Sequence, residues 1–206
     1  MNSERLTRQM QFIVEIDKLK QVLRRTITIN DDRNENSAEH SWHAAVMALV
    51  LAEHAEAGLD ITRTVKMILV HDLVEIDAGD TYCYDTQGAR DKLERETRAA
   101  ERIFNLLPPD QAAEVRALWD EFEAGRTAEA RFANALDRLE ALLLNYHTGG
   151  RTWRKHNVAS DQVIERALPI GDGSPALWEY AQRLIEDAVE QGILTPRDHR
   201  REGAER

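Results

Sequence analysis

A run of polar side chains stands inside a strongly apolar segment near the middle of the chain. His71, Asp72 and Glu75 follow directly on Met67-Ile68-Leu69-Val70. A helix that is apolar on nearly all sides is normally buried, and a buried charge must be paired or bound to a metal. At 3.6 residues per turn, Glu75 lies about 40° from His71 and about 60° from Asp72 around the helix axis. The three groups can therefore face one point, with His71 and Asp72 as adjacent ligands of a divalent cation and Glu75 beside a water molecule. The alternative, a pair of charges on a helix surface, fits this apolar context less well.

Two other apolar segments carry polar groups of the same kind. His40 lies near the start of a helix predicted over 37–56, and Asp137 lies beside the leucine stripe of a helix predicted over 128–146. Taken alone, His40 could be a core histidine and Asp137 the partner of an ion pair. Together with the His71-Asp72 pair they form a mixed imidazole and carboxylate set. Such a set suits one divalent metal ion, with Mn²⁺, Fe²⁺, Co²⁺, Ni²⁺ and Zn²⁺ before Mg²⁺, rather than an all-oxygen calcium site.

The elements that would position these groups are helices. Apolar residues recur at steps of three and four in several segments, and no segment shows the alternation of a strand. The predicted helices cover residues 4–24, 37–56, 67–78, 90–102, 110–122, 128–146 and 174–191. Gly149-Gly150 opens a predicted loop. We therefore predict an all-α fold.

Length and composition indicate one domain over residues 1–206, with a core over about 11–146, a helical extension over 150–192 and a solvated tail over 193–206. The net charge of −10 argues against a nucleic-acid polymer as partner. No apolar run is long enough for a membrane span, and the first residues do not form a signal peptide. We expect a cytoplasmic protein with no membrane partner. The single cysteine, Cys83, excludes an internal disulfide.

The order and separation of His40, His71-Asp72 and Asp137 resemble the H…HD…D pattern of HD-superfamily metal-dependent phosphohydrolases. The surrounding segments 37–41, 71–80 and 130–140 resemble the 5′-deoxynucleotidase branch and the related HD-domain-containing protein 2 group. The resemblance runs from about residue 11 to residue 146. It implies an orthogonal bundle of about seven or eight helices, one catalytic metal, and removal of the 5′-phosphate from deoxynucleoside monophosphates.

The resemblance also implies roles for single residues, beginning with the four metal ligands His40, His71, Asp72 and Asp137. Glu75 would be the general acid and base, and Asp80 would lie near the sugar or the leaving oxygen. Arg25 falls where that branch has a phosphate-binding arginine. The next residue is a tryptophan that shapes the sugar pocket in members of the branch, whereas this chain has Thr26. We therefore expect weaker selection against ribose. His43 matches no family ligand and is expected in the core or behind a ligand.

Three alternatives stay open at this stage. A di-metal HD oxygenase would need further histidines on core helices, which are not evident in the sequence. An HD hydrolase could act on another phosphate ester, and a degenerate HD module could serve only for binding or dimerisation. The intact ligand set disfavours such a module. Members of the resembled group are commonly dimers, so a homodimer is expected, and the helix over 174–191 could cover either a partner or the core.

Overall fold

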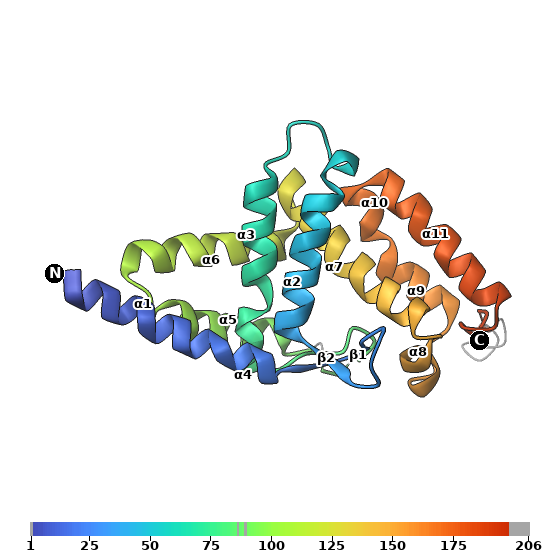
Figure 1. Cartoon of the computed structure of the whole chain (residues 1–206), viewed down its shortest axis with the longest axis horizontal. Helices are drawn as coiled ribbons and strands as arrows, with labels where there is room; N and C mark the ends of the chain where they lie inside the picture. The colour runs from blue at the N-terminus through green and yellow to red at the C-terminus, as the bar shows by residue number, and fades with distance from the viewer. Residues whose placement is uncertain (1, 86, 89, 198–206) are drawn as a thin grey trace.

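The computed structural model describes residues 2–85, 87–88 and 90–197, and a long helix, α7 (Ala128–His147), runs through the middle of it (Figure 1). This helix packs against α2 (Ser37–Val50), α3 (Ile61–His71), α6 (Pro109–Ala124) and α10 (Pro169–Gly173). In Figure 1, α2 and α3 lie side by side and cross the directions of α1 (Asn2–Ile16), α5 (Lys92–Phe104) and α6. The predicted all-α orthogonal bundle is confirmed. The described residues form eight helices of seven or more residues, and none of these is long and apolar enough to cross a membrane.

Local sequence signals set the ends of the helices that carry the predicted ligands. The Asn36 side chain accepts a hydrogen bond from the Glu39 backbone N–H, and the Glu39 carboxylate accepts one from the Asn36 backbone N–H, which completes a capping box at the start of α2. The Thr127 hydroxyl caps α7 by accepting from Ala130 N. On α7 the apolar stripe of Phe132, Leu136 and Leu139 is buried in the core. These caps and stripes fix the phase of each helix and so the direction of its polar side chains.

The central segment is not one continuous helix. Helix α3 ends at His71, a 3₁₀ turn covers Asp72–Val74, and α4 covers Glu75–Ala78. In a 3₁₀ turn the side chains at i and i+3 eclipse one another. This turn geometry places Glu75 on the same side as Asp72, and the charge of Asp72 acts on the Glu75 carboxyl group.

The prediction of a helix through residue 24 and of no strands is wrong for the segment after α1. A 3₁₀ turn covers Asp17–Gln21, and a small antiparallel hairpin follows, with β1 (Leu23–Ile27) paired to β2 (Asn34–Asn36) and an irregularity in the register. The run Thr26-Ile27-Thr28-Ile29 is β-branched throughout, which favours extended backbone over helix. Along β1 the side chains alternate, so Arg24 and Thr26 turn inward and Arg25 turns outward.

The segment after Gly149-Gly150 is helical rather than a long loop. It forms α8 (Arg151–Lys155), α9 (Ser160–Ala167) and α10, and then α11 (Pro175–Glu190) begins after its Ser174 cap as predicted. The predicted start of the solvated tail at residue 193 is also wrong, because Leu194 is 1% exposed and belongs to the core. The rest of that predicted tail, residues 198–206, lies outside the described residues.

Candidate metal centre and substrate cavity

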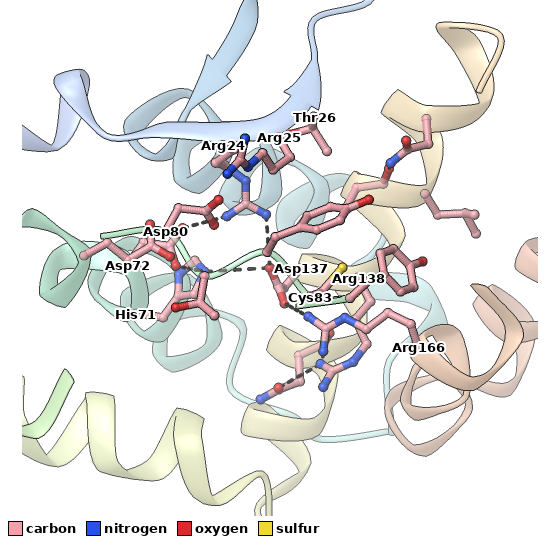
Figure 2. Close-up of a pocket in the computed structure, with 18 of the residues that line it drawn as sticks. Arg24, Arg25, Thr26, His71, Asp72, Asp80, Cys83, Asp137, Arg138 and Arg166 are labelled. Carbon is pink, nitrogen blue, oxygen red and sulfur yellow. Dashed lines mark hydrogen bonds and ion pairs between the residues drawn. The ribbon is translucent and has the colours of Figure 1, made fainter. Parts of the chain in front are cut away.

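The structure brings the four predicted ligands together from three helices and one turn. Figure 2 shows three of them, His71, Asp72 and Asp137. The potential ligand atoms of His40, His71 and Asp72 lie within 4.8 Å of one another. Asp137 Oδ1 lies 3.0 Å from His40 Nε2 and 3.9 Å from His71 Nε2. His40, His71 and Asp72 are buried. Two imidazoles and two carboxylates therefore converge on one point.

The hydrogen bonds of His71 show what this point is suited to hold. Its Nδ1 lies 2.6 Å from the carbonyl oxygen of Ile68, so Nδ1 carries the proton and donates it to that oxygen. Its Nε2 then presents a lone pair, is buried, and has no hydrogen-bond partner among the described residues. The nearest atom of opposite formal charge, Asp72 Oδ1 at 3.0 Å, lacks hydrogen-bond geometry. A lone pair that faces carboxylate oxygens fits a cation between them, as expected for metal-ligating histidines whose other nitrogen is held by a carbonyl.

His40 is held in the same way from behind. Its Nδ1 lies 2.9 Å from Glu140 Oε2, and the other oxygen of Glu140 lies 3.0 Å from His43 Nδ1. Glu35 completes this layer, because its Oε2 accepts a hydrogen bond from the Thr26 hydroxyl at 3.0 Å. Burial and the charge of Glu140 raise the pKa of Glu35 to about 8. Glu140 fixes the His40 ring so that its Nε2 points to Asp137. His43 contacts Glu140 and not the candidate metal ligands, which agrees with its expected place behind a ligand.

Arg24 is one of the residues of this site that the sequence patterns do not identify. Its Nη1 donates to Asp72 Oδ2 at 3.1 Å, and its Nη2 lies 4.0 Å from Asp137 Oδ1 (Figure 2). Burial alone lowers the pKa of Arg24, but the charges of Asp72 and Asp137 outweigh it and raise that pKa. The neighbouring Arg25, which the resemblance assigns to phosphate, lies on the outward side of β1. Both arginines line the same cavity.

Glu75 and Asp80 lie beside the ligands without joining them. Glu75 Oε2 accepts a hydrogen bond from the Ser37 hydroxyl at 2.6 Å. Burial, followed by the charge of Asp72, raises the pKa of Glu75 to about 8, and burial also raises the pKa of Asp80. A carboxyl group with a pKa near neutrality can both give and take a proton, which is what a general acid and base needs.

A cavity of about 260 Å³ opens beside this cluster. One wall is a face of α7 that runs from Asn134 to Asn145, a rise of about 16 Å along the helix axis. The walls opposite come from β1, from the turn after α4, and from α8 and α9, with the residues Arg24, Arg25, Thr26, Asp80, Tyr82, Tyr84, Trp153 and Arg166 among them. Polar groups surround the end of the cavity beside the candidate metal ligands, while Leu142, Trp153 and Val163 make the other end partly apolar.

Several buried polar atoms that have no hydrogen-bond partner lie at this cavity. Seven such side-chain atoms occur among the described residues, and five belong to residues of the cavity wall: Arg24 Nε, His71 Nε2, Tyr82 Oη, Arg138 Nε and Asn145 Oδ1. Folded proteins leave few buried polar groups unpaired, and the exceptions call for an explanation. Their concentration around one cavity indicates that this cavity binds a polar ligand.

The fold agrees with that of proteins to which the chain is similar. A crystal structure of a predicted metal-dependent phosphohydrolase from Magnetospirillum magnetotacticum MS-1 superimposes with a TM-score of 0.90 at 54% identity, covering 93% of this chain and 96% of that one. A conserved hypothetical protein from Pyrococcus furiosus, 23% identical with a TM-score of 0.60 over 84% of this chain and 99% of that one, shares the fold alone.

Curated relatives are named as 5′-deoxynucleotidases. The 5′-deoxynucleotidase HDDC2 of Homo sapiens is 36% identical over 135 residues, which are 65% of this chain and 65% of that protein. The protein of the same name from Dictyostelium discoideum is 30% identical over 68% of this chain and 77% of that protein. The match thus spans a little under two thirds of the human protein's length. An HD domain model matches residues 16–178. That match covers well over half of the sequence, and the chain therefore belongs to the HD domain family.

Proposed function

We propose that this protein is a metal-dependent phosphohydrolase that removes the 5′-phosphate from deoxynucleoside and nucleoside monophosphates. The observation that carries the proposal is the unpartnered His71 Nε2, which faces the carboxylates of Asp72 and Asp137 at the end of a cavity. The names of the curated relatives support the nucleotide part of the proposal.

His40, His71, Asp72 and Asp137 would hold one divalent cation, which supplies polarisation of a phosphoryl oxygen and a water molecule of lowered pKa. Glu75 orients the attacking water and exchanges a proton with it or with the departing 5′-oxygen, because its carboxyl group titrates near neutrality. Arg24 lies among the ligand carboxylates, where its charge offsets that of the phosphoryl oxygens.

The cavity has places for the other parts of a nucleotide. Asp80 and Arg25 line it near the ligand end, where the sugar and its phosphate would lie. Leu142, Trp153 and Val163 offer apolar surface to a nucleobase at the far end. Thr26 lines the same cavity, is buried, and is tied to Glu35 by its hydroxyl. A small side chain at this position leaves room for a 2′-hydroxyl, and a pocket that merely leaves room discriminates by only about 1–3 kcal/mol. We therefore propose that deoxyribonucleotides and ribonucleotides are both cleaved.

A phosphate-release screen tests this function. The purified protein is incubated with deoxynucleoside and nucleoside 5′-monophosphates, with a 3′-monophosphate and with phenyl phosphate, each with Mn²⁺, Co²⁺, Ni²⁺, Fe²⁺, Zn²⁺ or Mg²⁺. We expect release from the 5′-monophosphates and a ratio of kcat/KM for dAMP over AMP below about 100. Release from phenyl phosphate alone would indicate another phosphate ester. No release with any metal would leave a binding module as the better account.

A homodimer is a further proposal, and we place its interface on α2 rather than on α11. The apolar side chains of α11 are buried within the chain, including Leu177, Ala181 and Ile185, so this helix covers the core. Helix α2 instead exposes Trp42, Leu49 and Val50. Light scattering at micromolar concentration on the wild type and on Leu49→Glu tests whether this face joins two copies. The cytoplasmic location stays a prediction.

A further inference from the structure

Two arginines lie on the side of Asp137 that faces away from Arg24. Arg138 is the next residue of α7, and Arg166 comes from α9 across the cavity. Figure 2 shows the guanidinium groups of Arg138 and Arg166 next to one another below Asp137, and each acts electrostatically on the other. Like charges this close repel one another, and an anion between or beside them offsets the repulsion.

Among the described residues, one carboxylate, that of Asp137, forms an ion pair with either arginine. Arg166 Nη2 lies 3.8 Å from Asp137 Oδ2, while Oδ1 of the same carboxylate faces His40 at 3.0 Å. Asp137 is thus shared between Arg166 and the candidate metal centre. Glu123 also lines this part of the cavity, but among the described residues it forms no ion pair with either arginine.

The hydrogen bonds of Arg138 leave part of its guanidinium unused. Nη1 donates to the backbone oxygen of Asn134 at 3.0 Å and to its side-chain Oδ1 at 2.9 Å. Nε is buried and has no partner among the described residues. Anchoring by Nη1 holds the planar group, and with it the positive charge, in place beside Arg166.

We propose that Arg166, with Arg138 behind it, binds the phosphate group that is hydrolysed, on the side of the metal centre opposite Arg24. Arg166 is the more exposed of the two and lies within 3.8 Å of a candidate ligand carboxylate. A phosphate that shares the centre with Asp137 therefore comes within reach of the Arg166 guanidinium. Arg138 is a positioning residue in this arrangement, because its fixed charge adds to the local positive potential. This inference rests on the proposed function and adds the residues that recognise the phosphate.

The test uses Arg166→Gln, Arg166→Lys and the control Arg183→Gln, whose arginine pairs only with Glu179 on the surface of α11 among the described residues. Binding of inorganic phosphate is measured by isothermal titration calorimetry with and without Mn²⁺, and kcat/KM is measured for dAMP and for phenyl phosphate. We expect Arg166→Gln to weaken phosphate binding about 10- to 100-fold, as for the loss of hydrogen bonds to a charged group. We expect kcat/KM to fall by a similar factor for both substrates. Arg166→Lys should restore part of the binding, and Arg183→Gln should match the wild type.

Two results would overturn the inference. One is unchanged phosphate binding in Arg166→Gln. The other is a fall in kcat/KM for dAMP with none for phenyl phosphate, which would assign the pair to the nucleoside rather than to the phosphate. A wild type that releases no phosphate from any nucleotide would contradict the proposed function, and the calorimetry would still test the arginine pair. Arg138→Gln gives a second test, with a smaller expected loss of phosphate binding, provided that its thermal unfolding matches the wild type.

Discussion

The two ring nitrogens of His40 face two clusters of nearly the same composition. Nε2 faces His71, Asp72 and Asp137, and Nδ1 faces Glu35, His43 and Glu140. Each cluster contains one further histidine and two carboxylates, all near one another. Composition alone would allow a cation in either cluster.

Hydrogen bonds pair the polar atoms of the Nδ1 cluster, whereas the Nε2 cluster keeps an atom without a hydrogen-bond partner. Both oxygens of Glu140 have imidazole partners, and Glu35 has the Thr26 hydroxyl. The raised pKa of Glu35 allows it to keep a proton beside Glu140. On the other side, His71 Nε2 has no partner, and His71, Asp72 and Asp137 line the cavity. Unmet hydrogen bonds and access to a cavity, rather than residue types, therefore distinguish the candidate metal site from the layer that supports it.

The largest effect is expected from Asp72→Ala, which removes a carboxylate from the Nε2 cluster. We expect metal affinity to fall by more than about 100-fold, beyond the usual cost of losing a supporting residue, and phosphate release to fall to background. Elemental analysis after dialysis measures the metal. Asp120→Ala, which removes a surface carboxylate paired with Arg116, should keep it. Unchanged stoichiometry in Asp72→Ala would contradict the assignment of this cluster as the metal site.

Glu75→Gln tests whether Glu75 acts as the general acid and base or as a metal ligand. Glutamine keeps the size of the side chain and a partner for Ser37, but it cannot exchange the proton. We expect the metal to stay bound while kcat falls by about 10²-fold or more, the usual scale for general acid–base catalysis. Metal analysis and turnover are measured on one preparation. Joint loss of metal and activity would identify Glu75 as a ligand instead.

Glu140→Gln tests the supporting role of the Nδ1 cluster. The amide can still contact His40, but it lacks the charge that holds the ring and makes it a better ligand. We expect metal affinity to fall about 10- to 100-fold, less than in Asp72→Ala, with activity restored at high metal concentration. A titration of activity against Mn²⁺ measures this. Activity that stays lost at saturating metal would show that Glu140 does more than orient His40.

The smallest effect is expected from His43→Gln and depends on pH. The hydrogen bond to Glu140 raises the pKa of His43 in the folded protein, although partial burial opposes it. Protonated His43 therefore stabilises the fold fully below the unfolded pKa of about 6.5, and this contribution is lost as pH rises through the raised value. We expect the loss of unfolding free energy in His43→Gln to be largest in mildly acidic solution and to shrink above neutrality. Urea unfolding across this range measures it, with His54→Gln as the control on an exposed histidine. A loss that does not vary with pH would contradict the ion pair.

Three of the four candidate ligands could be predicted from the sequence because they lie on regular helices. His40, His71 and Asp137 stand beside apolar stripes whose period fixes which way they face. Glu140 could have been found by the same rule, since it lies one turn after Asp137 on α7.

Arg24 could not be found in this way, because its direction depends on a strand. The side chains of β1 alternate, and the irregular pairing between Leu23 and Ile27 decides whether Arg24 or Arg25 points inward. The sequence places two arginines in succession and gives no register. Arg166 was missed for another reason. Helix α9 has eight residues, too few for a periodic pattern to separate it from a loop.

The hairpin that carries Arg24 depends on a part of the chain made much later. The Thr152 hydroxyl of α8 donates to the backbone oxygen of Arg25 at 3.1 Å, across 127 residues, and Arg151 pairs with Asp32 in the hairpin loop. Contacts between residues so distant along the chain form slowly, because a long loop must close first. During synthesis, all four candidate metal ligands leave the ribosome before α8 and α9. The wall that α8 and α9 give to the cavity is therefore the last part of the candidate site to leave the ribosome.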